Sequence, residues 1–193
     1  VLSLAIGAML SGCEDGDSAR SGNLSGKGGS LARFAVNATH LYAVDNTALK
    51  VYQFESGGAI REVNSIKLGA GVETITTRDS WLYIGTNRAM FIYDISDPAS
   101  PSFVSEYNHF VGCDPVVVQD TLAFVTLRTT GCRPASWNTL DVINIKDPKT
   151  PEVINSMGLS MPYGLGIDGK LLFVCEGVYG LNVYDVSDPF DLK

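Results

Sequence analysis

Positively charged residues are few in this sequence. Its 193 residues contain 14 Lys and Arg against 21 Asp and Glu, which gives a net charge of −7 at pH 7. The basic residues are also scattered along the chain, whereas nucleic acids and anionic membrane surfaces are bound by clustered cations. The composition therefore disfavours nucleic acid as a partner, and it disfavours membrane attachment that depends on charge.

The sequence also lacks the short motifs of the common enzyme classes. Gly-x-Ser-x-Gly, His-Glu-x-x-His and Gly-rich phosphate loops are all absent. Of its two histidines, His40 stands at the start of an expected strand, which favours a structural role. We expect no cofactor and no metal site. A catalytic carboxylate pair formed by Glu73 and Asp114 stays open, because the sequence does not give their separation.

No apolar run is long enough to span a bilayer, which takes about 20 residues. An uncharged stretch, residues 1–12, precedes Cys13 and is typical of the apolar part of an export signal. Leu10-Ser11-Gly12-Cys13 resembles the bacterial lipobox, which predicts that Cys13 is acylated and becomes the N-terminus of the mature protein. Because an initiating Met and the usual basic residues are missing, we expect the chain to begin within its signal.

The segment after Cys13 is typical of a tether. Residues 14–30 are rich in Gly and Ser and almost free of apolar residues, so they are expected to be flexible. Glu14, Asp15 and Asp17 resemble the acidic cluster that sends some Gram-negative lipoproteins to the outer surface. We therefore expect an exported protein, lipid-anchored to the bacterial envelope at the outer membrane, on its periplasmic or surface face.

The chain repeats a short apolar segment four times. Leu49, Met90, Leu140 and Leu181 begin the segments LKVYQF, MFIYDI, LDVINI and LNVYDV, at spacings of 41, 50 and 41 residues. A second set of segments, LYAVD, LYIGT, AFVTL and LFVCE, keeps the same register. Two independent matches in one register indicate a tandem array.

Each unit is expected to contain four β-strands. In the second unit, ETITTR, WLYIGT, MFIYDIS and SFVSEY are rich in β-branched and aromatic residues and are separated by turn-forming residues. Four-stranded units of about 41 residues are typical of β-propeller blades. We therefore predict an all-β propeller of four antiparallel blades, at residues 31–70, 71–111, 112–160 and 161–193, with the last blade incomplete and the ring open.

An Asp-Pro pair follows the third predicted strand in three of the units. The proline presets its backbone for a tight turn, and the aspartate is expected to accept a hydrogen bond from a nearby backbone N–H. Calcium binding by these aspartates is a minor alternative, since no dense carboxylate cage repeats. The first unit departs from the pattern and has Glu55-Ser56-Gly57-Gly58 instead. The pairs are Asp97-Pro98, Asp147-Pro148 and Asp188-Pro189.

The segments LDVINIKDP and LNVYDVSDP resemble the LVIVD repeat, which is found in propeller-forming surface or exported proteins of bacteria and archaea. The resemblance covers residues 31–193. Because it concerns strands and turns, it implies a fold and not an activity.

Two cysteines lie on either side of the longest repeat unit's first strands. The third unit is about nine residues longer than its neighbours, and the additional residues fall in the segment 128–138. In an oxidising exterior we predict a disulfide between Cys113 and Cys132, which would stabilise the fold by about 3 kcal/mol. A zinc site that also uses His109 is an alternative without the usual ligand spacing. Cys175 is expected to be a small, buried and reduced core residue.

The loops that enter the innermost strands of a propeller converge near its central channel. Glu73, Asp114 and Tyr163 occupy this place in three repeat units and are the candidate ligand-binding residues. Two carboxylates and a phenol accept hydrogen bonds, which favours a glycan or a cationic group over a phosphate. Further residues are expected around the same rim if the insertion folds over it, namely Arg78, Arg128, Phe110 and Trp137.

These observations favour a non-enzymatic envelope lipoprotein whose propeller binds a protein, a glycan or a small molecule. Two alternatives stay open. A propeller enzyme, such as a glycan lyase or hydrolase, would need several convergent His, Arg, Tyr or carboxylate side chains on the rim. A structural or assembly role would be favoured by a small and neutral rim.

Overall fold

The computed structural model describes residues 32–69, 71–108, 115–128 and 138–193, which form four antiparallel sheets in chain order. The first two sheets are built from β1 (Phe34–Val36), β2 (His40–Val44), β3 (Ala48–Phe54) and β4 (Ile60–Lys67), and from β5 (Val72–Arg78), β6 (Trp81–Thr86), β7 (Ala89–Asp94) and β8 (Ser102–Asn108). The other two are built from β9 (Val116–Gln119), β10 (Leu122–Leu127), β11 (Thr139–Asn144) and β12 (Glu152–Gly158), and from β13 (Leu165–Asp168), β14 (Leu171–Cys175) and β15 (Leu181–Asp185).

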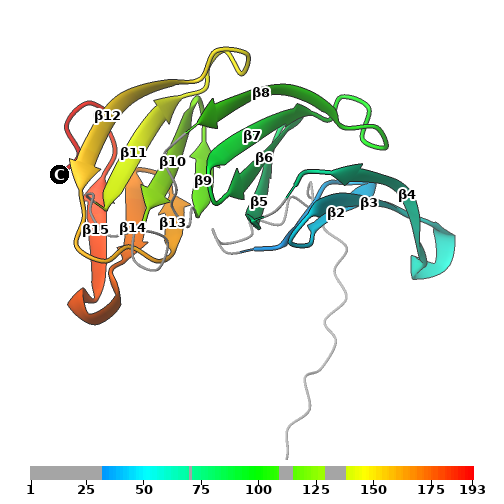
Figure 1. Cartoon of the computed structure of the whole chain (residues 1–193), viewed down its shortest axis with the longest axis horizontal. Helices are drawn as coiled ribbons and strands as arrows, with labels where there is room; N and C mark the ends of the chain where they lie inside the picture. Colours follow the sequence, from blue (N-terminus) through cyan, green and yellow to red (C-terminus); the bar gives the residue numbers. More distant parts are fainter. Residues whose placement is uncertain (1–31, 70, 109–114, 129–137) are drawn as a thin grey trace, which may run out of the picture.

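The four sheets are arranged as the blades of a propeller. Within each sheet, strands that follow one another in sequence pair side by side, so the first strand lies at one edge. The first strands contact one another from sheet to sheet, β1 with β5, β5 with β9 and β9 with β13. The sheets therefore fan out from a line of inner strands into an open arc, as Figure 1 shows. The predicted all-β propeller is confirmed, with three strands in the fourth sheet. Among the described residues, no helix is long and apolar enough to cross a membrane.

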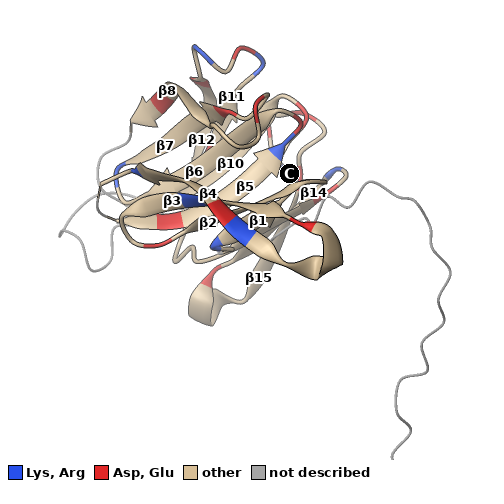
Figure 2. Ribbon diagram, turned by 90° about the vertical axis from the view of Figure 1, so that its right-hand side faces the viewer, with Lys and Arg blue, Asp and Glu red and all other residues tan. Residues whose placement is uncertain are grey.

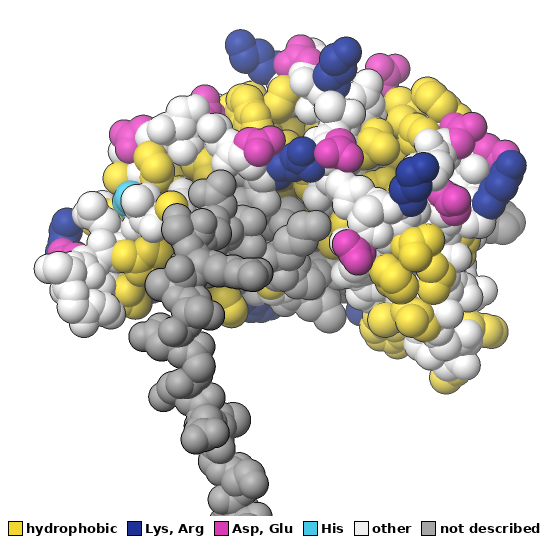
Figure 3. All heavy atoms as spheres, turned by 180° about the vertical axis from the view of Figure 1, so that it is seen from behind, with side chains coloured by type: hydrophobic (Ala, Val, Ile, Leu, Met, Phe, Trp, Pro, Cys, Tyr) yellow, Lys and Arg dark blue, Asp and Glu magenta, His cyan; other side chains and the backbone are white. Residues whose placement is uncertain are grey.

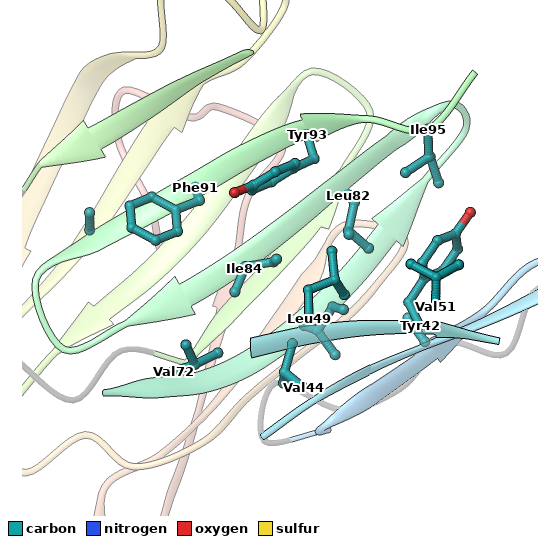
Figure 4. Close-up of a cluster of buried hydrophobic side chains, with 13 residues drawn as sticks. Tyr42, Val44, Leu49, Val51, Val72, Leu82, Ile84, Phe91, Tyr93 and Ile95 are labelled. Carbon is teal, nitrogen blue, oxygen red and sulfur yellow. The ribbon is translucent and has the colours of Figure 1, made fainter. Parts of the chain in front are cut away.

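Hydrophobic clusters fill the spaces between neighbouring sheets. The repeated leucine positions supply their centre, since Leu49 and Leu140 are fully buried and Met90 is 1% exposed. Figure 4 shows the cluster between the first two sheets, where Leu49 and Val51 from β3 face the second sheet. Each sheet buries the face that meets its neighbour, so the repeated apolar residues are the ones that pack one sheet on the next.

The aspartates of the Asp-Pro pairs act as predicted. Each accepts a hydrogen bond at Oδ1 from the backbone N–H two residues further on, which closes an Asx turn. The N–H donors are those of Ala99 to Asp97 at 3.1 Å, Lys149 to Asp147 at 3.0 Å, and Phe190 to Asp188 at 3.0 Å.

The same turns also link neighbouring sheets. In each complete sheet the pairing of the third and fourth strands slips by one residue, leaving a β-bulge. The residue after the bulge donates a side-chain hydrogen bond to a carbonyl of the next sheet's turn, an arrangement that we call the turn latch. The latch pairs are Asn64 Nδ2 to Ala99 O at 3.0 Å, Ser105 Oγ to Pro148 O, and Asn155 Nδ2 to Pro189 O at 3.2 Å.

We expect the turn latch to contribute measurably to stability. Asn155→Ala removes a partly buried hydrogen bond and should lower the free energy of unfolding by about 0.5–1.5 kcal/mol. Asn108→Ala is the matched control, because the amide of Asn108 is exposed and donates to Glu106 of its own strand. Thermal unfolding followed by circular dichroism measures both variants. Equal shifts in the two melting temperatures would contradict a role for the latch.

The first sheet departs from the Asp-Pro turn, as the sequence indicated. Residues Ser56–Gly58 form a short 3-10 turn in which Gly57 and Gly58 have φ of 82° and 83°. These positive φ values favour glycine, which explains the Gly-Gly pair at this place. Arg61 binds Glu55 across the turn with an Nε to Oε1 distance of 2.7 Å.

His40 has the structural role that its sequence position indicated. Its ring is buried at the start of β2, and Nδ1 lies 2.8 Å from Thr39 Oγ1. Burial lowers the pKa of His40, an effect that the nearby Asp97 carboxylate partly opposes. Burial therefore favours the neutral form of the His40 side chain.

Candidate functional site

The two ends of the strands form two different rims of the propeller. At one end the inner strands begin, and the connections between second and third strands lie beside them; we call this end the entry rim. The Asp-Pro turns lie at the other end, since Trp81 pairs with both Arg78 and Asp94. In Figure 1 the Asp-Pro turns of the second and third sheets are the loops that join β7 to β8 and β11 to β12.

Of the three candidate ligand-binding residues, the structure describes Glu73 and Tyr163, and both lie on the entry rim. Glu73 is the bulged residue at the start of β5, between Val72, which pairs with Thr86, and Thr74, which pairs with Gly85. Its side chain is half-buried, and Tyr163, two residues before β13, is 40% exposed. Neither residue belongs to the hydrophobic clusters that fill the spaces between the sheets. Asp114 lies outside the described residues.

Arg128 and Tyr163 meet at the boundary between the third and fourth sheets. Arg128 directly follows β10, and its Cζ lies 4.2 Å from the centroid of the Tyr163 ring. Such a cation–π contact stabilises by about 0.5–2 kcal/mol, more where water is excluded. Two residues that the sequence suggested separately are therefore one unit, a guanidinium stacked on a partly exposed phenol.

Glu176 holds the loop that carries Tyr163, and its role was not identified from the sequence. Its carboxylate is 2% exposed and accepts three hydrogen bonds. The donors are Ser160 N at 2.7 Å, Met161 N at 3.2 Å and Asn182 Nδ2 at 2.6 Å. The backbone of Tyr163 is fixed as well, because its N–H donates to Cys175 O at 2.8 Å. The loop that carries the Tyr163 ring is thus anchored by a buried carboxylate.

Gly177 leaves the space in which the Tyr163 ring lies. Its φ is +56°, and a Cβ at this position would come within 2.8 Å of Tyr163 Cε2 and 3.0 Å of Met161 Sδ. Only glycine adopts this positive φ without strain and also leaves the Tyr163 ring in place. The sequence signal for Glu176 was weak. The last position of the second strands holds Asp45, Thr86, Leu127 and Glu176 in the four units. These side chains differ too much in chemistry to predict a carboxylate.

Arg33 is a second residue that the sequence did not single out. Its Nη1 donates to Val72 O at 3.2 Å, so the guanidinium lies beside the residue that precedes Glu73. The repeat gave a weak signal, because Arg33 follows the position that corresponds to Glu73 one unit earlier. The entry rim therefore carries cationic groups next to its carboxylate and its phenol.

Arg78 does not lie on this rim, and the expectation for its place is wrong. It ends β5, while Glu73 is near the start of the same strand, about 16 Å away at the usual rise per residue. Its guanidinium lies 3.4 Å from Asp79 and 3.2 Å from Asp120, on the side of the Asp-Pro turns. Arg78 bridges the second and third sheets there and does not face the candidate site.

The expectation of a buried Cys175 is also wrong. Cys175 is exposed and forms no disulfide, because it ends β14 on the face that no other sheet covers. Several other candidates lie outside the described residues, namely Cys13, Cys113, Cys132, His109, Phe110 and Trp137.

The charged groups of the described chain do not form one dominant surface. Figure 2 shows Lys and Arg interspersed with Asp and Glu, mostly at turns and strand ends. No group of three or more His, Cys, Asp or Glu in the described ranges is placed to hold a metal ion. The entry rim can therefore offer stacking and hydrogen bonds, and this arrangement is suited to binding.

Comparison with known proteins agrees with this architecture. The profile of the LVIVD repeat matches residues 72–109, which span β5 to β8 and thus one whole sheet. One blade of this β-propeller is thus an LVIVD repeat. Comparison with curated protein sequences finds no match. The residues that match the LVIVD repeat are the residues that form the second blade.

Solved structures with a similar fold are larger than this LVIVD-repeat chain. One is a chain in an S. cerevisiae complex of Dbp5 with Nup159, Gle1, IP6 and ADP, with 10% identity, a TM-score of 0.59, and coverage of 85% of this chain and 42% of that chain. Another is the N-terminal domain of Nup159, with 8% identity, a TM-score of 0.55, and coverage of 80% and 40%. At such low identity the likeness concerns the fold alone, and the LVIVD-repeat chain spans about two fifths of their length.

Proposed function

We propose that this LVIVD-repeat propeller is a non-enzymatic binding protein that takes a glycan at its entry rim. The Arg128–Tyr163 contact carries the proposal, because it brings two candidate residues from different sheets to one exposed place. Sugar rings stack on aromatic side chains, and their hydroxyls donate to carboxylates and accept from guanidinium groups. Glu73 and Arg33 supply such groups along the rim. Asp114, outside the described residues, is proposed to add a second carboxylate. The repeat and its propeller fold are consistent with a binding or scaffold role.

Ligand binding should depend on the rim and not on fold stability. Tyr163→Ala and Glu73→Gln are each expected to raise the Kd for a glycan identified on an array by about tenfold, which corresponds to about 1.4 kcal/mol. Glu152→Gln is the matched control, since Glu152 is exposed on the outer strand β12. Titration calorimetry gives the Kd values, and the melting temperatures should stay nearly unchanged. Unaltered affinity in both rim variants would reject this site.

We also propose that the protein is exported and anchored to the envelope, at the outer membrane, through acylated Cys13, with a disulfide between Cys113 and Cys132. The lipobox-like segment and the two flanking cysteines of the insertion support this proposal. Radiolabelled palmitate should be incorporated in the complete gene product and lost in Cys13→Ser, with release from the membrane fraction. Recovery of both Cys113 and Cys132 as free thiols from protein never exposed to reductant would contradict the disulfide.

A further inference from the structure

Three buried side-chain atoms in the described part of the chain have no hydrogen-bond partner, namely His40 Nε2, Thr126 Oγ1 and Arg128 Nε. Buried polar groups of folded proteins nearly always have one, so each such atom needs an explanation. Thr126 lies near the end of β10, and Arg128 directly follows that strand. The end of β10 therefore carries two hydrogen-bond donors that the described residues leave unused.

Both donors are on the side of the third sheet that meets the fourth sheet. Thr126 is 0% exposed and pairs across the strands with Leu140, a member of the hydrophobic cluster between these two sheets. Side chains two residues apart in a strand point to the same face, which places Arg128 on that side as well. The stacking of Arg128 on Tyr163 agrees with this, because Tyr163 lies in the loop before β13. The two donors thus face one boundary, close to the entry rim.

The positive charge of Arg128 has no carboxylate partner among the described residues, whose ion pairs involve other basic side chains. Figure 3 shows the more usual arrangement, since most Lys and Arg side chains on the visible face lie beside Asp or Glu. Glu176 holds the same loop, but its carboxylate accepts from three other donors. A half-buried guanidinium cannot lose its proton, and burial of its charge without a counter-charge is costly. Arg128 is therefore suited to a bound anion.

A carboxylate fits these donors better than a phosphate does. A guanidinium binds a carboxylate through charge-assisted hydrogen bonds, and a hydroxyl can donate to the second carboxylate oxygen. A phosphate monoester carries nearly two negative charges at pH 7, and the same rim already contains Glu73. Stacking on Tyr163 also restricts the guanidinium before a ligand arrives, which lowers the entropy lost on binding. The arrangement favours a ligand group with one negative charge and two acceptor oxygens.

We propose that Arg128 and Thr126 form a subsite for the carboxylate of an acidic sugar, such as a uronic acid unit of a glycan. The subsite rests on the proposed glycan-binding function and adds the class of sugar that the entry rim takes. The carboxylate enters at the rim, where Arg128 is half-buried and Tyr163 is 40% exposed. It accepts hydrogen bonds from Arg128 Nε and, deeper between the sheets, from Thr126 Oγ1.

D-glucuronate and D-glucose are matched probes for this subsite, because they differ only in having a carboxylate or a primary alcohol at C6. Two-dimensional NMR of the ¹⁵N-labelled whole protein reports directly on the Nε–H group of Arg128. D-glucuronate should shift this signal and bind about tenfold more tightly than D-glucose, or more, as expected for one charge-assisted contact. An Arg128 signal that D-glucuronate leaves unmoved would overturn the subsite.

The two sugars also separate the subsite from the proposed function. Equal binding of D-glucuronate and D-glucose at the entry rim would reject the carboxylate subsite and leave glycan binding intact. Binding of D-glucuronate at Arg128 by a protein that retains no glycan on an array would support the subsite and reject glycan binding as the function. Binding of neither sugar would overturn the subsite, whatever the array shows.

Variants test the two donors separately. Arg128→Gln should reduce the affinity for D-glucuronate to that for D-glucose, whereas Arg61→Gln, which removes an exposed guanidinium of the first sheet, should leave it unchanged. Thr126→Val removes only the hydroxyl and should weaken D-glucuronate binding by about three- to tenfold, the usual effect of one hydrogen bond. Its melting temperature should not fall, because the hydroxyl has no partner among the described residues.

Thr86→Val is the comparison for the stability of Thr126→Val. Thr86 is also a buried threonine, but its Oγ1 donates to Ala89 O at 2.9 Å, so this variant should have a lower melting temperature. A fall for Thr126→Val as large as that for Thr86→Val would show that the Thr126 hydroxyl is already paired within the protein. That result, or unchanged affinity of Thr126→Val for D-glucuronate, would contradict the role of Thr126.

Discussion

Phe124→Ala is expected to lower the free energy of unfolding by about 3–5 kcal/mol, the usual cost of removing a buried aromatic ring. Phe124 is 1% exposed and belongs to the cluster that joins the third and fourth sheets. Its neighbours there include Leu140 and Val174, which come from both sheets. The cavity left by the substitution therefore weakens the third sheet and also its contact with the fourth sheet.

Phe190→Ala is the matched control for this substitution. The chemical change is the same, but Phe190 is 68% exposed beside an Asp-Pro turn, so the expected effect is within about 0.5 kcal/mol. Urea unfolding followed by circular dichroism measures both variants. For a domain of this size, Phe124→Ala should lower the melting temperature by roughly 10 °C. A loss below about 1 kcal/mol would mean that the boundary between these sheets is not packed as described.

Glu176→Ala should produce the second largest loss, about 1–3 kcal/mol, because three donors lose their acceptor in a buried place. Two of these donors are the N–H groups of Ser160 and Met161, which hold the loop before Tyr163. The substitution should therefore also weaken the proposed glycan binding at the entry rim, although Glu176 itself is buried. Glu176→Gln retains an amide oxygen as acceptor and should recover part of both losses.

Exposed carboxylates provide the comparison for Glu176. Glu152→Ala removes the same group from the outer strand β12 and should change the free energy of unfolding by less than about 0.5 kcal/mol. Urea unfolding and calorimetric titration together separate the two effects. Equal stability of Glu176→Ala and Glu152→Ala would show that the loop before Tyr163 does not depend on the buried carboxylate.

The columns of the repeat were sufficient to predict the fold. Leu49, Met90 and Leu140 stand in one register, and the only architecture that buries each of them against a neighbour is a series of stacked sheets. The Asp-Pro turns were predictable for a similar reason, since proline and aspartate act on residues next to them in the chain. Local chemistry and a strict period are therefore the parts of this fold that can be derived from sequence.

Features that depend on one additional residue could not be derived. The bulge before Asn64, Ser105 and Asn155 breaks the two-residue period of the outer strands, and this slip turns their side chains towards the next sheet. Nothing in the alternation of the sequence marks the slip. The donors of the turn latch could therefore be identified only from the strand register.

The errors at Arg78 and Cys175 have physical causes. Arg78 was expected around the entry rim if the insertion folded over it, but β5 has seven residues and carries Glu73 and Arg78 to opposite rims. Cys175 was expected to be buried because its strand is apolar. Burial of a strand's second face depends on the sheet that covers it, and β14 is covered on one face only in this structure.

The turn latch gives the second and third blades two different connecting groups each. Ser105 on the outer strand of the second sheet donates to the turn of the third, and the second sheet's own turn accepts from Asn64 of the first. A unit with a donor on one side and an acceptor on the other fits its own copy without any compensating substitution. Duplication of the coding segment for one blade would therefore produce a matched neighbour at once, so arrays of this repeat can lengthen or shorten by whole units while each new boundary remains hydrogen-bonded.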